Sequence, residues 1–93
     1  MSVDPARHLL RALRRSAAAA CCEIVLAHEA LDPWSSVTFV GARHRVVVRG
    51  TGMASWLAEL PELDLPMSGC FVAGCDVEWA EDGAVLTILV LEE

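Results

Sequence analysis

Asp82-Gly83 constrains the fold of this chain more than any other feature, because it stands between two strand-like segments that have apolar residues at every second position. This dipeptide is a strong signal for a two-residue turn between antiparallel strands. With these two residues as the loop, three pairs form one apolar face: Trp79 with Leu86, Val77 with Ile88, and Cys75 with Val90. The sequence therefore predicts a hairpin at the end of the chain, with one face that other elements must cover.

A first helix is predicted from residue 5 to about residue 20. Asp4 is a typical N-cap residue, and Pro5 suits the first helical position. Apolar residues then recur at helical spacing: Ala6, Leu9, Leu10, Leu13, Ala17 and Ala20. Four arginines fall mostly on the opposite face: Arg7, Arg11, Arg14 and Arg15. We expect this basic face to be solvated and to pair with acidic residues of the same domain, since it lacks the aromatic residues typical of nucleic-acid sites.

A second, shorter helix is predicted over residues 52–60. Four apolar residues have the spacing of one helix face: Met53, Trp56, Leu57 and Leu60. Thr51 is a candidate cap, and Pro61 is expected to end the helix. Residues 62–68 then form a linker inside the domain.

The middle of the chain predicts three strands. Residues 22–31 form the first, which Asp32-Pro33 is expected to break. Residues 36–41 and 44–49 form a hairpin if Ala42 and Arg43 make its turn, although Ala-Arg is a poor pair for a two-residue turn. That turn pairs Val37 with Val48 and Phe39 with Val46 on one face, and it places Thr38 and Val40 on the other.

The element order is thus α-β-β-β-α-β-β, which predicts an α+β domain with an antiparallel sheet of about five strands and two helices on one face. The face under the helices is expected to carry these residues: Ile24, Leu26, Val37, Phe39, Val46, Val48, Val77, Trp79, Ile88 and Val90. Alternation places a second set on the open face: Val25, Thr38, Val40, Arg45, Val47, Arg49, Asp76, Glu78, Leu89 and Leu91.

This open face mixes aliphatic side chains with charges of both signs, which is unusual for a purely solvated surface. A two-fold homodimer would bury the aliphatic groups and set Arg45 and Arg49 against Asp76 and Glu78. Trp34, expected in a loop after Asp32-Pro33, is a further candidate anchor for a partner. The predicted partner-binding residues are Arg45, Val47, Arg49, Asp76, Glu78, Leu89, Leu91 and Trp34.

The charges are divided along the chain. All seven basic residues lie at or before Arg49, whereas residues 50–93 carry nine of the 13 acidic residues and no Lys or Arg. Such a division favours attraction within one fold or between two copies. The net charge of −6 argues against nucleic-acid binding, which requires positive side chains to neutralise phosphates.

Size and composition set further bounds. Ninety-three residues suffice for one domain and not for two, so residues 1–93 are predicted to form a single domain. The hydrophobic share of 55% exceeds the usual level of about 45–50%, so some apolar surface is expected to need a partner.

The apolar runs are too short for an export signal or a membrane span, and we expect a cytoplasmic protein without membrane contact. The absence of Lys, Tyr, Asn and Gln indicates a GC-rich, bacterial genome.

No motif predicts a cofactor, a metal or a catalytic centre. Cys21 and Cys22 are adjacent and point in different directions, and Cys70 and Cys75 fall on opposite faces of a strand. Without a C-x-x-C motif, we expect the four cysteines to be buried core residues. His28 and His44 lie near strand ends without a spacing that demands catalysis, and no Ser has a nucleophile motif.

The sequence therefore favours a small, non-enzymatic protein that acts by protein–protein association, first as a homodimer through its open sheet face. An alternative is a small enzyme or ligand-binding domain with a pocket between the second helix, the 61–69 linker and the sheet, using Asp64 or Asp76 and His28. A third possibility is an acidic module, with acids from residues 59–82, that binds a basic partner.

Overall fold

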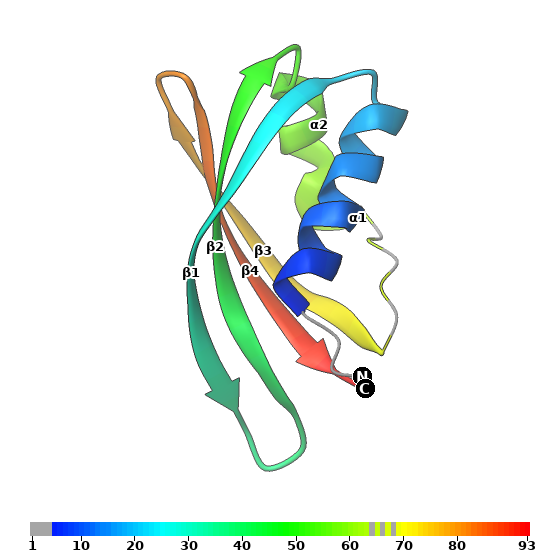
Figure 1. Cartoon of the computed structure of the whole chain (residues 1–93), viewed down its shortest axis with the longest axis vertical. Helices are drawn as coiled ribbons and strands as arrows, with labels where there is room; N and C mark the ends of the chain where they lie inside the picture. Colours follow the sequence, from blue (N-terminus) through cyan, green and yellow to red (C-terminus); the bar gives the residue numbers. More distant parts are fainter. Residues whose placement is uncertain (1–4, 64, 66, 68) are drawn as a thin grey trace.

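The computed structural model describes residues 5–63, 65, 67 and 69–93 (Figure 1). The elements in chain order are α1 (Pro5–Ala19), β1 (Glu23–Ser35), β2 (Val40–Thr51), α2 (Ala54–Glu59), a 3-10 turn η1 (Leu60–Glu62), β3 (Cys70–Ala80) and β4 (Gly83–Glu92). In this described part the four strands form one antiparallel sheet in the order β1-β2-β4-β3. The predicted α+β class is confirmed, whereas the strand number is four and the order is α-β-β-α-β-β.

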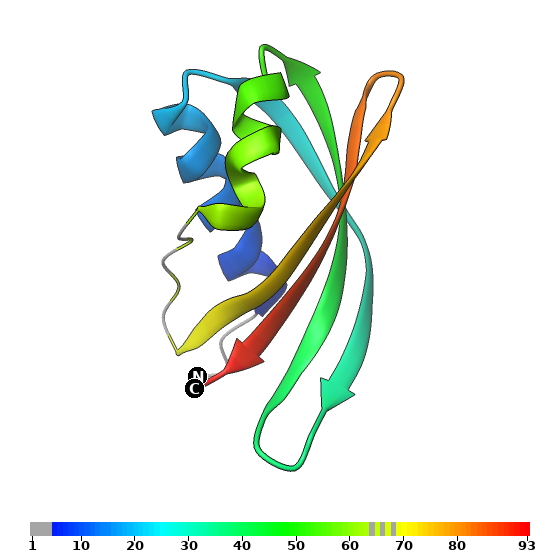
Figure 2. The same cartoon turned by 180° about the vertical axis from the view of Figure 1, so that it is seen from behind.

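Both helices lie on the same face of the sheet, as Figures 1 and 2 show from opposite sides. β2 and β3 run parallel to each other, because each is antiparallel to β4. The segment that contains α2 connects them on the helix side. The β1–β2 hairpin extends past the helices at its turn, so that end of the sheet has no helical cover.

The core lies between the helices and the sheet. Every fourth residue of α1 from Leu9 to Ala17 is buried, as the predicted helical spacing requires. The indole Nε1 of Trp56 on α2 donates a 2.9 Å hydrogen bond to Ser16 Oγ on α1, which joins the two helices. The sheet contributes buried aliphatic residues to the same cluster: Val46, Val48, Ala84, Leu86, Ile88 and Val90.

The C-terminus of α1 is closed by a Schellman motif. Cys21 adopts a left-handed conformation with φ of 59°, a position that usually holds glycine. The Cys22 N–H donates to the Ala17 carbonyl at 2.9 Å, and the Cys21 N–H donates to the Ala18 carbonyl at 3.0 Å. The predicted helix end near residue 20 is confirmed, while the predicted N-cap Asp4 lies outside the described residues.

The second helix begins later than predicted. Its N-cap is Met53, which makes no side-chain cap bond, so Thr51 is not the cap. The residues predicted to form its apolar face are all buried, and Pro61 lies in the 3-10 turn that ends the helix. Asp64, Pro66 and Ser68 of the predicted linker lie outside the described residues.

The predicted break at Asp32-Pro33 is wrong. β1 continues to Ser35, and Pro33 pairs with Ala42 on β2. Proline is tolerated here because β1 is an edge strand, where a missing N–H breaks no ladder on the outer side. The turn therefore lies at residues 36–39 and not at Ala42-Arg43, and its Ser36 N–H donates to the Phe39 carbonyl at 2.8 Å.

This change of register moves several residues from their predicted faces. Val37 and Phe39, expected under the helices, lie in the exposed turn, where Val37 is fully exposed. Thr38 belongs to the same turn. Val40, expected on the open face, pairs with Ser35 and shares its side of the sheet with Ala42 on β2.

The last hairpin is confirmed, with its register shifted by two residues. Ala80 pairs with Gly83, so Glu81 and Asp82 form the turn. A shift of two residues keeps each side chain on its predicted face, because side chains alternate with a period of two. Trp79 thus faces the helix side, but it lies near the hairpin turn and is 56% exposed, which contradicts its predicted place in the core.

Candidate interaction face of the sheet

The sheet face opposite the helices is the candidate interaction site, and it is referred to below as the open face. It is built by alternate residues of all four strands. Its charged members are all exposed: Glu29, Asp32, Arg43, Arg45, Arg49, Asp76 and Glu78. Its larger apolar members are exposed or half-buried: Val25, Trp34, Val47, Phe71, Val85 and Leu89. Both classes of group predicted for this face are therefore present on it.

The charges of the open face are sorted by strand. The edge strand β1 carries the anions Glu29 and Asp32, whereas β2 carries the cations Arg43, Arg45 and Arg49 and β3 carries the anions Asp76 and Glu78. β4 runs between them and contributes uncharged residues, which are Gly83, Val85, Thr87, Leu89 and Leu91. The open face thus has a positive column and a negative column on either side of a mostly apolar strand.

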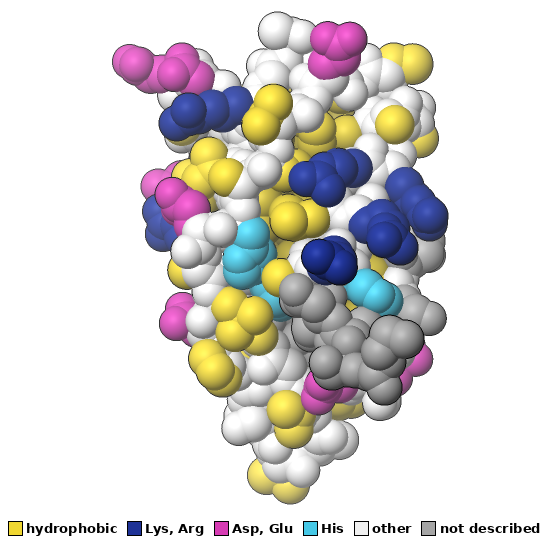
Figure 3. All heavy atoms as spheres, viewed as in Figure 1, with side chains coloured by type: hydrophobic (Ala, Val, Ile, Leu, Met, Phe, Trp, Pro, Cys, Tyr) yellow, Lys and Arg dark blue, Asp and Glu magenta, His cyan; other side chains and the backbone are white. Residues whose placement is uncertain are grey.

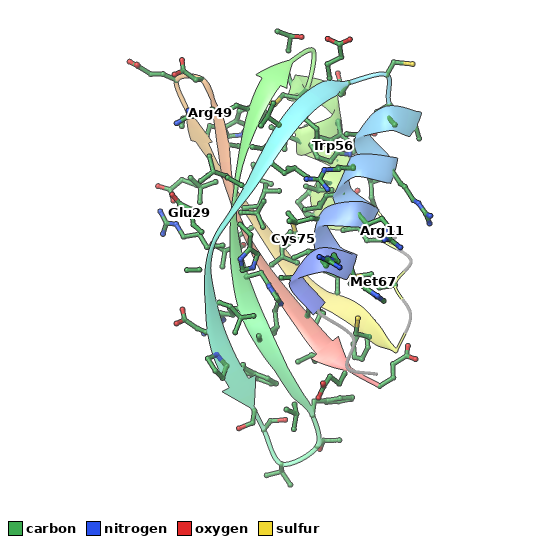
Figure 4. The ribbon with its side chains drawn as sticks, in the orientation of Figure 1. Arg11, Glu29, Arg49, Trp56, Met67 and Cys75 are labelled. Carbon is green, nitrogen blue, oxygen red and sulfur yellow. The ribbon has the colours of Figure 1, made fainter. Side chains whose placement is uncertain are left out.

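Arg45 has a partner that the sequence did not indicate. Its Nε donates to Glu29 Oε2 at 3.1 Å, and both side chains are about half exposed. Glu29 reaches this face because a bulge in β1 inserts an extra residue between His28 and Ala30. An exposed pair of this kind contributes about 0–1 kcal/mol, so Arg45 stays available to other anions at little cost. Figure 4 shows Glu29 and Arg49 pointing away from the helices.

An aromatic cluster closes one end of the open face. The rings of Phe39 and Phe71 meet edge to face with centroids 5.8 Å apart. Leu91 lies between Phe71 and Gly41 in the strand register and is only 5% exposed. Leu91 is therefore covered within the chain, although it lies on the predicted face. Trp34 continues this row at Gly41, half-buried in strand β1 and not in the predicted loop.

On the helix side, the two strand histidines meet. His28 Nε2 and His44 Nδ1 are 2.9 Å apart, and the His44 ring is fully buried. One nitrogen must donate and the other accept, so one proton serves this contact. A small cavity of about 190 Å³ adjoins His44 and Cys70 under the uncovered end of the β1–β2 hairpin. Sequence spacing did not predict this contact, because it depends on the corrected register of β1.

The cysteines are only partly core residues. Cys70 is buried and Cys75 half-buried, whereas Cys21 is exposed, contrary to prediction. Burial, with a smaller contribution from the Asp76 carboxylate, raises the pKa of the Cys75 thiol from 9.0 to about 11. Burial and the nearby Glu93 and Glu92 carboxylates also raise the pKa of Cys70. Among the described residues, no three His, Cys, Asp or Glu side chains converge as metal ligands.

The pocket of the alternative hypothesis has a different position from the one expected. A groove of about 510 Å³ lies between α1 and α2, and its polar lining consists of Arg15, Ser16 and Glu59. His28 faces the helix side of β1, while Asp76 lies on the open face, so the structure does not bring them together. Asp64 lies outside the described residues.

Comparisons with known protein families, with curated proteins and with solved structures find no match to this chain. Within the described part of the chain, no helix has the length and apolar character needed to cross a membrane. The case for a function therefore depends on the open face itself.

Proposed function

We propose that this protein acts through protein–protein association, with a two-fold homodimer formed by the open face as its first assembly. One observation carries the proposal: the cation column of β2 and the anion column of β3 flank β4 at equal distance. A two-fold axis parallel to β4 exchanges the two columns, so each column of one copy faces the opposite charge of the other copy.

The register makes this complementarity specific. Arg45, Thr87 and Asp76 occupy one row across β2, β4 and β3. Rotation about an axis along β4 keeps every residue at the same position along the strand direction. Arg45 of one copy therefore faces Asp76 of the second copy. An axis across the strands would instead set arginine against arginine, which disfavours that arrangement.

The size and chemistry of the open face suit such a dimer. An axis along β4 stacks β2, β4 and β3 of the two copies, a planar footprint of roughly 14 by 34 Å, which places the dimer at the small end of specific interfaces. Aligned packing of two sheets would bury Val47, Val85 and Leu89 at its centre. The aliphatic residues would supply most of the free energy, and the charge columns would fix orientation.

Light scattering coupled to gel filtration tests the proposal directly. At high micromolar concentration we expect a mass of twice the 10.0 kDa of one chain. A second sample with Leu89→Asp, which places a charge at the centre of the open face, should run as a monomer with an unchanged circular dichroism spectrum. A wild-type protein that stays monomeric at this concentration would overturn the proposal.

A further inference from the structure

The outer side of α1 carries a basic surface that the open face does not involve. Its four arginines are exposed, and with Ala18 they line a shallow groove of about 440 Å³: Arg7, Arg11, Arg14 and Arg15. The space-filling view shows basic side chains gathered over α1 (Figure 3), and Figure 4 shows Arg11 projecting away from the sheet. This surface is the opposite in sign to the net charge of −6 of the whole chain.

The neutralising partners expected from the sequence are not supplied by the described carboxylates. Among the described residues, Arg45 forms an ion pair with Glu29, and this pair lies on the side of the sheet that faces away from α1. Among the described acids of residues 50–93, Asp76 and Glu78 lie on the open face, on the other side of the sheet from α1. No carboxylate of the described residues therefore forms an ion pair with the α1 arginines, and these exposed side chains can contact added anions.

The basic surface continues into an apolar groove. Arg15 lines both the basic groove and the groove of about 510 Å³ between α1 and α2. The α1 wall of the second groove is made of small residues, and its far side carries Leu63, which is 37% exposed, beside Leu65 and Trp56. A ligand that lies along α1 would therefore meet guanidinium groups on one flank and apolar side chains on the other.

We propose that this surface, formed by the α1 arginines and the α1–α2 groove, binds an acidic amphipathic helix of a partner protein. A helix matches both flanks at once, because acids at i and i+4 reach the arginines while apolar residues at intermediate positions enter the groove. The arginines span nine residues of α1, from Arg7 to Arg15, which is about 12 Å and faces roughly two turns of such a ligand.

Two other occupants fit less well. A nucleic acid would place phosphates beside Glu59 at the groove rim, and the four arginines have no stacking side chain among them. A second copy of this chain does not supply the helix from its described residues, since α1 contains no acid and α2 has only six residues. The partner is therefore a different protein.

Fluorescence anisotropy with a defined probe tests the proposal. The probe is a labelled, end-capped peptide of about 18 residues with Leu at i, i+3, i+4 and i+7 and Glu on the flank beside them. We expect saturable binding that weakens at least about tenfold in Arg7→Ala/Arg11→Ala/Arg14→Ala and weakens as salt rises from about 0.05 to about 0.3 M. The substituted side chains are exposed, so circular dichroism should show an intact fold.

The controls separate this surface from the open face. The variant Arg43→Ala/Arg49→Ala removes the same kind of charge from the open face and should bind the probe as the wild type does, even if its self-association changes. Absence of probe binding, equal binding of a scrambled peptide of the same composition, or tighter binding of a DNA or RNA duplex than of the probe would each overturn the proposal.

Discussion

Arg45 and Asp76 lie on the same face of the sheet and in the same row, with Thr87 of β4 between them. Adjacent strands are about 4.8 Å apart, so the two backbones are separated by roughly 10 Å within one chain. Arg45 accordingly pairs with Glu29 on its other side and not with Asp76. In this row the two opposite charges lie at equal distances on either side of β4. A two-fold axis along β4 would therefore bring each charge opposite its counterpart on the second copy.

Reversing these two charges tests that axis. Either Arg45→Asp or Asp76→Arg alone should weaken dimerisation about five- to tenfold, because each sets like charges against each other across the axis. The double variant should recover most of the loss. Sedimentation equilibrium measures the three constants. Arg14→Asp, the same change on α1, serves as the control and should leave dimerisation unchanged; failure of the double variant to recover affinity would contradict the row pairing.

A glycine in β4 permits a close approach between two strands. A β-carbon at Gly83 would run into the Val48 carbonyl oxygen and lie 3.1 Å from the Arg49 Cα. Both neighbours are backbone atoms and cannot turn away, so we expect Gly83→Ala to lower the free energy of unfolding by about 2 kcal/mol or more.

Gly74 in β3 is the matched control for this substitution. A β-carbon there meets no atom within 4 Å, and the residue is exposed. Gly74→Ala should therefore be neutral or stabilising by up to about 1 kcal/mol, because alanine restricts the unfolded chain. Urea denaturation of the two variants measures the difference, and equal losses would show that the contact at residue 83 is not decisive.

Cys21 occupies a left-handed position for which its side chain is poorly suited. Cys21→Gly should raise the free energy of unfolding by about 0.5–1 kcal/mol, since glycine has no β-carbon to clash in this conformation. Cys21→Ala keeps the β-carbon and should give no gain, which separates the backbone effect from loss of the thiol. Thermal unfolding followed by circular dichroism compares them. A gain in both variants would point to the thiol as the cause.

The sequence predicted features that depend on local periodicity. The span of α1, its buried residues from Leu9 to Ala17, and the two faces of the β3–β4 hairpin follow from spacings of 3.6 and 2. The shift of two residues at Glu81-Asp82 changed the pairs and preserved the faces. For that reason the charges predicted for the open face, Asp76 among them, lie on it in the structure.

Features that depend on neighbouring strands escaped prediction. Pro33 is compatible with β1 because β1 lies at the edge, which local sequence does not reveal. The bulge at Glu29 reverses the facing of later residues, so a strict alternation fails beyond it. Trp79 has the predicted facing, but the helices do not extend over it. Whether a distant helix covers a residue depends on the tertiary structure, which the periodicity of a single segment does not predict.

The Cys75 thiol makes the stability of this protein sensitive to alkaline pH. The chain contains neither Lys nor Tyr, so thiols are the side chains that ionise between pH 9 and 11. The pKa of Cys75 is about 11 in the folded chain against 9.0 for an ordinary thiol. The unfolded chain therefore releases its proton first, and stability present below pH 9 is lost as pH rises toward 11.

We expect the loss from Cys75 to stay well below the full conversion of about 1.4 kcal/mol per unit of pKa difference, because solvent screens this half-buried thiol, and Cys70 acts in the same direction. Urea denaturation under reducing conditions from pH 8 to 11 measures it. Cys75→Ala should be less stable at pH 8, because it leaves a gap against the core, yet its stability should fall less steeply above pH 9. An equally steep fall in Cys75→Ala would show that burial of this thiol is not the cause.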